Sequence, residues 1–298
     1  MTSRGERAAG GNKGRRRRRG QGSELLVFTD LDGTLLDTDT YAWQPARPAL
    51  DALKAAAALL IPCTSKTWAE VKPLRAELGL RSPAVVENGA AIFGDADTPM
   101  LAAAESCASG EWAVSLGPGR SRVLAGLARM RQKVRGSLRG LSEIGDDELT
   151  ALTGLASSQL WAARERLHSE PFLADEATLE ELEAAATQEG LHVTRGGRFF
   201  HLGGRVDKGT AARIVVEGYR RRHWKGMTAG LGDSLNDRSL LAVVRCPILI
   251  PRADGEHDPA VLGAARNLCL ATHPGPEGWC EAVLALLDWN QQGTVLIE

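Results

Sequence analysis

Short apolar runs alternate with stretches of helix-forming composition in the N-terminal part of the chain. Three apolar runs have the length of a buried strand, and the segments between them have helical composition. We expect strands at residues 25–28, 59–63 and 84–86 and helices at residues 48–58 and 67–78. Strands that alternate with helices in this way favour a parallel sheet joined by helical crossovers.

The second of these helices has recognisable ends. Thr67 is a favourable N-cap because its hydroxyl can accept a hydrogen bond from an unpaired amide of the first turn, and Gly79 is a typical stop. Pro73 lies inside the segment and lacks an amide hydrogen, so we expect a kink or break there. In the preceding strand, Pro62 favours an edge or strand-end position for the same reason.

From about residue 96 the pattern changes to alanine-rich and charge-rich helical segments, followed by two short strands. We expect helices at residues 121–134, 157–168 and 178–188, and a hairpin of residues 191–194 and 198–202 around the turn Gly196-Gly197. The earlier alternation then resumes with a helix at residues 210–222 and strands at residues 227–231 and 247–250. This order predicts an α/β fold with a mainly parallel sheet and an inserted α+β unit.

Length and composition are those of an ordinary globular protein. The 298 residues are 43% apolar and 24% charged, enough for one large or two moderate domains. No run approaches the roughly 18 apolar residues that span a bilayer, and the N-terminus lacks an apolar signal segment, so we expect a soluble, cytoplasmic protein without membrane contact. The five cysteines include no C-x-x-C pair, which indicates reduced thiols, not a zinc site or disulfide framework.

The N-terminal segment is strongly basic and the rest of the chain is acidic. Residues 1–22 contain eight arginines and lysines against Glu6 alone, so their net charge is +7, and the remainder must carry −8 for the whole chain to reach −1. Glycines and the five consecutive arginines from Arg15 to Arg19 leave no core-forming side chains, so we expect residues 1–22 to be disordered. Such a tail can bind RNA or another polyanion by counterion release, but without interleaved aromatics a solvated extension is favoured.

Two carboxylates follow the first predicted strand. Asp30 and Asp32, in Asp30-Leu31-Asp32-Gly33-Thr34, are two residues apart, and in an extended segment side chains at this spacing point the same way. One aspartate can attack phosphorus and form an acyl phosphate while the other passes a proton to the leaving oxygen. An Asp-Gly turn or a calcium-binding loop would give the same short pattern, so the motif by itself leaves these readings open.

Three further polar clusters lie at or near the ends of predicted elements. Thr64 can hold a phosphoryl oxygen, Lys208 can neutralise charge, and the run 230–237 supplies the oxygen ligands that suit Mg²⁺. Each cluster alone also fits a helix-start threonine, a surface lysine or an acidic helix cap. Because ligands of open α/β sheets bind at the carboxyl ends of the strands, the four clusters together favour a phosphoryl-transfer site.

These motifs in this order resemble the haloacid dehalogenase (HAD) superfamily of phosphatases and phosphotransferases. The resemblance implies a HAD-like Rossmannoid core with a mainly parallel sheet and an inserted α+β cap of the C2B type. We therefore expect residues 23–96 and 205–298 to form the catalytic core, and residues 97–204 to form a cap that determines substrate specificity.

A finer resemblance is to the mannosyl-3-phosphoglycerate phosphatase family, over about residues 25–287. It rests on segments in both the core and the cap, at residues 64–67, 86–90, 152–154, 166–172, 197–201 and 275–279. One departure is Leu167-His168, where the family usually has an acidic residue and an aromatic before Ser-Glu-Pro. The arginine-rich tail is also foreign to the pattern.

The resemblance assigns a role to each motif. It implies that Asp30 is the nucleophile, that Asp32 is the general acid and then the base, and that Thr64 and Lys208 bind the transferring group. It places Mg²⁺ on Asp30, Asp233 and the backbone carbonyl of Asp32, with Asn236 and Asp237 orienting the metal or Lys208. The expected cofactor is therefore Mg²⁺.

The expected substrate is mannosyl-3-phosphoglycerate, hydrolysed to phosphate and the compatible solute mannosylglycerate. Its carboxylate and hydroxyls call for an arginine with neighbouring polar groups. The candidates are Arg166, Ser169 and Glu170 in the cap and Ser65, Lys66, Glu87 and Asn88 in the core. Arg166 also fits an exposed helix charge, and we expect His201 to be a structural histidine with its hydrogen bonds satisfied.

Other functions fit the same motifs. The nearest is a HAD phosphatase for glucosyl-3-phosphoglycerate, sucrose phosphate or another sugar phosphate. A phosphomutase would return the phosphoryl group from the aspartate to a sugar. A polyanion-binding protein would act through the tail from Arg15 to Arg19. The sequence leaves the oligomeric state open.

Overall fold

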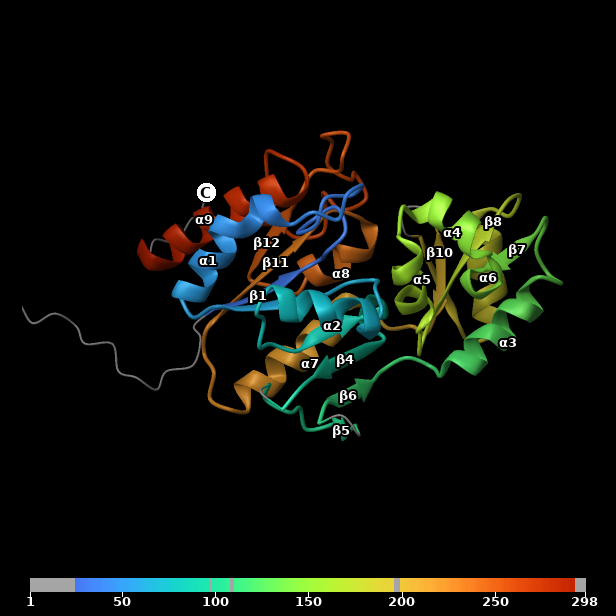
Figure 1. Ribbon diagram of the computed structural model, residues 1–298, viewed down its shortest axis with the longest axis horizontal. Helices are drawn as coiled ribbons and strands as arrows, with labels where there is room; N and C mark the ends of the chain where they lie inside the picture. Colours follow the sequence, from blue (N-terminus) through green and yellow to red (C-terminus); the bar gives the residue numbers. More distant parts are fainter. Residues whose placement is uncertain (1–24, 97, 108–109, 196–198, 293–298) are drawn as a thin grey trace, which may run out of the picture.

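A computed structural model describes residues 25–96, 98–107, 110–195 and 199–292 (Figure 1). The predicted basic tail, residues 1–22, and the predicted turn Gly196-Gly197 lie outside the described residues. Within them, the core elements lie on one side of Figure 1 and those of the inserted unit on the other. No helix of this described part is both long and apolar enough to cross a membrane.

A five-stranded parallel sheet, with strand order β13-β12-β11-β1-β2, is the centre of the core. Its strands are β1 (Leu25–Thr29), β2 (Leu59–Pro62), β11 (Met227–Gly232), β12 (Cys246–Leu249) and β13 (Cys269–Leu270). Every residue of β1 is buried because helices cover both faces of the sheet, which explains its uninterrupted apolar run. The predicted fold class is confirmed.

Four helices cover the two faces of this sheet. They are α1 (Arg47–Ala55), α2 (Trp68–Glu77), α7 (Lys208–Arg220) and α9 (Gly275–Gln292). Apolar residues of α1, α2 and α9 pack with Leu25 and Val27, whereas those of α7 pack with Leu26 and Phe28, which point the other way along β1. The alternation along one strand thus contributes to two apolar layers.

The break predicted at Pro73 is absent, since α2 continues through it from Trp68 to Glu77. The predicted N-cap is present: Thr67 accepts from the amide of Glu70, and the Glu70 carboxylate accepts from the amide of Thr67. This reciprocal pair and the burial of Val71 stabilise the helix and offset the hydrogen bond that proline cannot make.

A second, antiparallel sheet with strand order β3-β4-β6-β5 extends the core. Its strands are β3 (Ala84–Val86), β4 (Ala91–Gly94), β5 (Glu105–Ser106) and β6 (Trp112–Ser115). β3 adjoins β2 through a parallel bridge between Cys63 and Val85, and Trp112 and Val114 pack with α7. The predicted boundary between core and cap at residue 97 differs from this packing, which groups Leu101, Trp112 and Val114 with the core.

The inserted unit contains a third sheet, antiparallel, with strand order β7-β8-β10-β9. Its strands are β7 (Leu138–Gly140), β8 (Glu170–Ala174), β9 (His192–Arg195) and β10 (Phe200–Gly203). Its helices are α3 (Arg120–Met130), α4 (Asp146–Thr153), α5 (Ser157–Arg164) and α6 (Leu179–Gln188). The predicted hairpin and the predicted helices are present, with α3 and α5 ending four residues early. The division into core and cap stays a prediction, and below we call residues 118–204 the cap.

Short helical segments complete the chain. They are η1 (Gln44–Ala46), η2 (Glu87–Gly89), η3 (Leu141–Glu143), η4 (Leu235–Asp237) and α8 (Arg238–Leu241).

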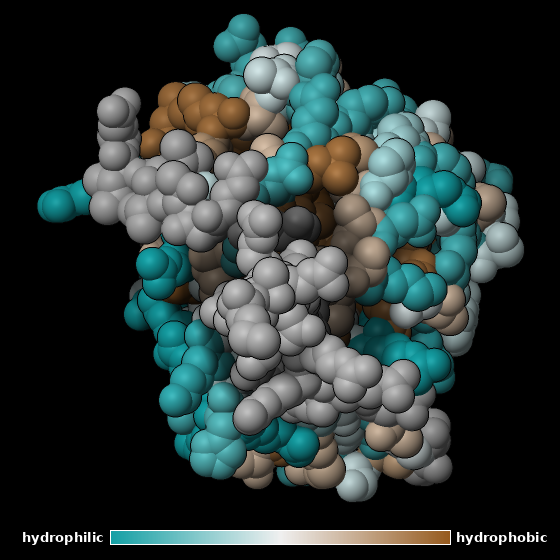
Figure 2. Space-filling model, turned by 90° about the vertical axis from the view of Figure 1, so that its left-hand side faces the viewer, coloured by the Kyte–Doolittle hydropathy of each residue, from teal (hydrophilic) through white to brown (hydrophobic). Residues whose placement is uncertain are grey.

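Figure 2 shows the face of the molecule that lies at the left-hand end of Figure 1. The coloured residues on this face are mostly hydrophilic, with smaller hydrophobic groups between them.

Candidate active site

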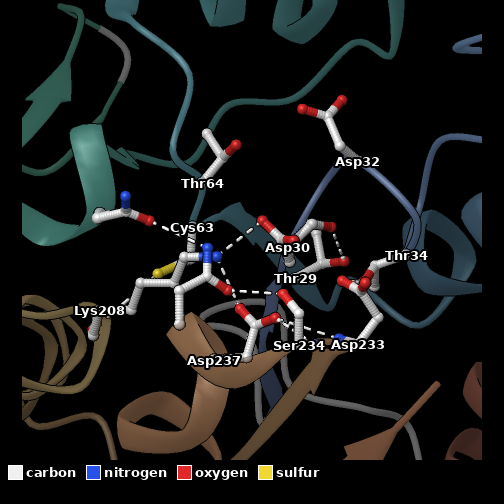
Figure 3. A network of polar contacts seen from close by, with 12 residues as sticks. Thr29, Asp30, Asp32, Thr34, Cys63, Thr64, Lys208, Asp233, Ser234 and Asp237 are labelled. Atoms are coloured by element: carbon white, nitrogen blue, oxygen red, sulfur yellow. Dashed lines mark hydrogen bonds and ion pairs between the residues drawn. The ribbon is translucent and has the colours of Figure 1, made fainter. Parts of the chain in front are cut away.

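Four segments that are far apart in the sequence meet at the carboxyl ends of the core strands (Figure 3). Asp30 follows β1, Thr64 follows β2, and Asp233 follows β11. Lys208 is the first residue of α7. The sheet aligns them directly, because the amide of Asp30 donates to the carbonyl of Leu231 at 2.9 Å. The predicted catalytic residues therefore lie together.

A buried lysine joins two of the carboxylates. Lys208 Nζ donates to Asp30 Oδ1 at 2.8 Å and to Asp237 Oδ1 at 2.6 Å, and both Lys208 and Asp237 are fully buried. Asp237 Oδ2 accepts from the amides of Asp233 and Ser234. Burial by itself lowers the pKa of Lys208, but the negative charges of Asp237 and Asp30 outweigh it and raise that pKa. Lys208 is therefore held as a cation beside the predicted nucleophile.

Three acidic groups crowd the same place. Carboxylate oxygens of Asp30, Asp233 and Asp237 lie within 4.8 Å of one another. Burial, reinforced by the negative charge of Asp237, raises the pKa of Asp30 to about 6. Burial and the charges of Asp237 and Asp30 also raise the pKa of Asp233. A cation placed among these oxygens would relieve the repulsion, so the group has the composition of a metal site.

Two glycines allow this close approach. Gly33 has a φ of +78°, and a Cβ there would lie 3.0 Å from Asp233 Oδ2. At Gly232, a Cβ would lie 2.4 Å from the Cβ of Asp237, which is closer than real side chains come. The glycines of the two acidic motifs therefore bring the carboxylates of β1 and β11 together.

The second aspartate of the first motif faces another lysine. Asp32 points away from the Lys208 cluster in Figure 3, and its Oδ1 lies 3.0 Å from Lys66 Nζ. Burial raises the pKa of Asp32, the charge of Lys66 opposes that effect, and the charge of Asp30 adds to it. The hydroxyl of Thr64 accepts from the amide of Lys66 at 3.2 Å. A carboxyl group with a raised pKa is suited to general acid catalysis.

Several predicted substrate-binding residues bond to one another across the boundary between core and cap. Arg166 Nη1 donates to the carbonyl of Ser65 at 3.2 Å and to Ser169 Oγ at 3.0 Å. Glu87 accepts from the amides of Leu167 and His168 and, at 2.6 Å, from Ser169 Oγ. Arg166 is buried and follows the end of α5, so its interpretation as an exposed helix charge is wrong.

Other predicted residues have different surroundings. Asn88 Oδ1 accepts from Asn236 Nδ2 at 3.2 Å, which ties the end of β3 to the acidic motif after β11. Glu170 is fully buried in the cap, where it accepts from the amide and hydroxyl of Ser142 and pairs with Arg120. Its present partners are thus all cap residues, and its role in substrate binding stays a prediction.

His201 does not have the satisfied hydrogen bonds that the sequence led us to expect. Its Nδ1 is buried without a hydrogen-bond partner in the described part of the chain. Burial, with smaller contributions from the charges of Arg166 and Lys208, lowers its pKa to about 3, so the ring is neutral at physiological pH. His201, Asn88 and Ser169 line one small cavity between core and cap.

Comparison with known proteins identifies the family of the chain. Residues 27–105 match the family model of the haloacid dehalogenase-like hydrolases. A glucosyl-3-phosphoglycerate/mannosyl-3-phosphoglycerate phosphatase of Methanococcoides burtonii is 36% identical over 269 residues, which cover 89% of this chain and 98% of that protein. The chain belongs to the haloacid dehalogenase-like hydrolases. A protein of the same name from Persephonella marina is 34% identical over 272 residues, covering 90% of this HAD chain and 99% of its relative.

The solved structures agree on the fold of this HAD protein. A sugar phosphatase of HAD subclass IIB has a TM-score of 0.61 at 15% identity, and the likeness covers 88% of this chain and 98% of that one. At such low identity it shows the fold alone. The likeness confirms the predicted HAD fold. The named relatives and the family model confirm the predicted class of enzyme, a phosphatase that acts on phosphoric monoesters.

Sequence reasoning assigned no role to several residues that hold this HAD site in place, although Thr34 and Trp279 lie in the motifs quoted above. Trp279 Nε1 donates to Thr29 Oγ1 at 2.9 Å, and Thr29 Oγ1 donates to the carbonyl of Asp30 at 2.7 Å. Thr34 Oγ1 donates to Asp233 Oδ1 at 3.1 Å. A signal for Thr29 was available, because it is a polar residue at the end of an otherwise apolar strand.

Proposed function

We propose that this phosphatase hydrolyses mannosyl-3-phosphoglycerate to mannosylglycerate and phosphate, with Mg²⁺ as its cofactor. The observation that supports this most is the pair of relatives that are 36% and 34% identical over nearly their whole length and named for this reaction. Their names also include glucosyl-3-phosphoglycerate, so that ester is the second candidate substrate. Both substrates combine a phosphate, a carboxylate and a polyhydroxylated sugar.

The first half of the reaction transfers the phosphoryl group to the enzyme. The Asp30 carboxylate attacks phosphorus, and an acyl phosphate forms as the bond between phosphorus and the sugar-bearing oxygen breaks. Asp32 gives its proton to that leaving oxygen. The raised pKa of Asp32 supports this role, because it keeps more of the carboxyl group protonated.

The second half releases phosphate. Asp32, now ionised, takes a proton from a water molecule as the water oxygen attacks the phosphorus of the acyl phosphate. The bond between phosphorus and the Asp30 oxygen breaks, so phosphate leaves and the Asp30 carboxylate is restored. Lys208, which is already 2.8 Å from Asp30, and the hydroxyl of Thr64 would hold the phosphoryl oxygens through both halves.

The acidic residues fit a bound Mg²⁺, which would neutralise charge on the phosphoryl oxygens. Of the five residues expected there, we propose the side chains of Asp30 and Asp233 and the backbone carbonyl of Asp32 as ligands. Asp237 is less suited because its two oxygens already accept from Lys208, Asp233 and Ser234. Asn236 bonds to Ser234 and Asn88, so we propose that Asn236 and Asp237 orient the site.

The residues that would select the sugar and the glycerate lie where the cap meets the core. Arg166 and Lys66 are cations that can attract the carboxylate of the substrate. Ser65 and Ser169 accept hydrogen bonds from Arg166, and Asn88 lines the same small cavity as Ser169. Glu87 is already bonded to the cap segment 167–169, so we propose that it fixes this segment in place and does not itself bind the sugar.

A substrate panel tests this proposal. Phosphate release is measured with mannosyl-3-phosphoglycerate, glucosyl-3-phosphoglycerate, sucrose phosphate and simple sugar phosphates, each with Mg²⁺ and with a chelator. We expect the highest kcat/KM for one of the two glycerate esters and loss of activity with the chelator. Similar rates across unrelated esters, or full activity in the chelator, would contradict the assigned substrate or the metal.

A phosphomutase is separated from a phosphatase by the fate of the phosphoryl group. Isomerised sugar phosphate without free phosphate would indicate a mutase, whereas we expect free phosphate in proportion to the alcohol formed. Polyanion binding by residues 1–22 stays an alternative that the sequence disfavours, and a cytoplasmic location stays a prediction. For the tail, deletion of residues 1–22 should leave RNA affinity unchanged across a salt titration.

A further inference from the structure

Tyr41 lies where the apolar clusters of core and cap meet. Its partly buried ring packs against the core cluster that includes Leu35 and Leu53, and against the cap cluster that includes Leu149 and Leu160. Its hydroxyl donates to the carbonyl of Thr153, the last residue of α4, at 3.0 Å. This core residue is therefore directly bonded to the cap.

The ring of Tyr41 also contacts the lysine that faces the predicted acid. Lys66 Nζ lies 4.6 Å from the centre of the Tyr41 ring and 3.0 Å from Asp32 Oδ1. A cation at that distance is attracted to the face of an aromatic ring. A continuous series of contacts thus runs from the Thr153 carbonyl through Tyr41 and Lys66 to the carboxylate of Asp32.

The loop holds Tyr41 in a strained backbone conformation. Its φ of 58° is in the left-handed region, which is rare for a bulky aromatic residue. The amide of Tyr41 donates to the carbonyl of Asp37, and the Asp37 carboxylate accepts from the amide and hydroxyl of Thr40. Such strain persists only where the surroundings impose it, and it is found mostly at functional sites.

We propose that Tyr41 is a positioning residue that couples docking of the cap to alignment of the Lys66–Asp32 pair. When the cap docks, the Tyr41 hydroxyl bonds to Thr153, and the ring confines the Lys66 ammonium group beside Asp32. Asp32 is then held in position to give its proton to the leaving oxygen. The inference deepens the proposed function, because it concerns only the step in which an alcohol departs.

Two substrates separate this role from a merely structural one. An alkyl phosphate, such as the best ester of the panel, releases a basic alkoxide that needs a proton from Asp32. The leaving group of p-nitrophenyl phosphate is weakly basic and needs none. The constant kcat/KM covers the steps up to formation of the acyl phosphate, and the leaving group departs in the last of these steps. Loss of proton donation by Asp32 therefore lowers kcat/KM for the alkyl ester and leaves it unchanged for p-nitrophenyl phosphate. The comparison holds for whichever alkyl ester is accepted, so failure of the assigned substrate leaves this test intact.

Two variants dissect the two contacts of Tyr41. Tyr41→Leu removes both the ring face and the hydroxyl, and we expect it to lower kcat/KM for the alkyl ester about tenfold while changing that for p-nitrophenyl phosphate less than about twofold. Tyr41→Phe keeps the ring and loses only the bond to Thr153, so we expect kcat to be retained and KM for the alkyl ester to rise about threefold to tenfold. Trp43→Phe is the matched control, because Trp43 is in the same loop and bonds to Glu77 instead of the cap.

A double-mutant cycle with Lys66→Met tests the coupling. In that background Tyr41→Leu should have little further effect on kcat/KM for the alkyl ester. The proposal would be overturned if Tyr41→Leu lowered kcat/KM equally for the alkyl ester and for p-nitrophenyl phosphate. It would also be overturned if the losses in kcat/KM of the two single variants were fully additive in the double variant. If circular dichroism shows that Tyr41→Leu is unfolded, Tyr41→Phe decides: a raised KM with kcat retained supports the proposal, and an unchanged KM overturns it.

Discussion

Lys208 and Asp237 form a buried ion pair with 2.6 Å between Nζ and Oδ1, and the same ammonium group also bonds to Asp30. Lys208 and Asp237 are far apart in the sequence. They meet because the chain passes from α7 into β11, which ends at Gly232, just before the acidic residues that follow it. Because all three groups are buried, each relies on the others to compensate its charge.

Removal of the lysine should therefore destabilise the fold as well as the reaction. In Lys208→Met, two carboxylates lose their buried counter-charge, and we expect the free energy of unfolding to fall by about 3 to 5 kcal/mol. Urea unfolding measures this. Lys208→Met combined with Asp237→Asn should recover part of the loss, since one uncompensated charge is gone. A double variant as unstable as the single one would contradict this account.

Asp30→Asn should abolish turnover while the protein stays folded, because an amide cannot form the acyl phosphate. We expect phosphate release to fall by about 10⁴-fold or more. The melting temperature should not fall, since the change removes a charge that repels Asp237 and Asp233. Asp39→Asn, an exposed aspartate in the same segment, is the control. Near-normal turnover in Asp30→Asn would show that the nucleophile is another residue.

Metal binding should weaken in acid. Because the pKa of Asp30 is raised to about 6 in the metal-free protein, protons compete with Mg²⁺ below that pH. We expect the affinity for Mg²⁺, measured by titration calorimetry, to fall about tenfold or more between pH 7 and pH 5. An affinity that is the same at both pH values would count against Asp30 as a ligand.

The raised pKa of Asp30 also predicts how the stability of the metal-free protein changes with pH. The folded state holds the Asp30 proton more tightly than the unfolded state, whose pKa is near 3.8. The contribution of Asp30 to stability is therefore fully present below pH 3.8 and is lost as the pH rises through about 6. Thermal melts in a chelator should show this loss in the wild type, and Asp30→Asn should reduce it.

Glu87→Gln should loosen the contact between core and cap. Glu87 accepts from two amides and the Ser169 hydroxyl, and glutamine offers only one accepting oxygen. We expect unfolding to become easier by about 1 to 3 kcal/mol and KM to rise. Glu165→Gln, at an exposed position beside the same segment, should change neither quantity. Equal effects of the two variants would remove the special role of Glu87.

The candidate catalytic residues could be located from the sequence because each belongs to a short local pattern. Asp30 follows an apolar run, and Asp233 follows another, so the strand ends were recognisable without any tertiary information. The break at Pro73 could not be judged in this way, since it depended on the opposing stability that Thr67, Glu70 and the buried Val71 give to α2. The short strands β4, β5 and β6 were missed because they form an antiparallel sheet with β3 and do not pair with the parallel sheet.

The cap contacts were harder to predict for a related reason. Arg166 reads as a surface charge when only its neighbours in the sequence are considered, yet it is buried against Ser65 and Ser169. Tyr41 stands in a polar loop without periodicity, and nothing local indicates its bond to Thr153. Both depend on how the inserted unit docks.

By itself the sequence determined the class of fold, the strands and helices around the central sheet and the positions of the candidate reacting carboxylates, because these follow from local chemistry and from the direction of parallel strands. Only the tertiary structure decided which lysine serves which aspartate, with Lys208 beside Asp30 and Lys66 beside Asp32. The physical reason is that a charge is paired and a pKa is shifted by burial and by neighbours in space, which distant parts of the chain supply only after they have packed.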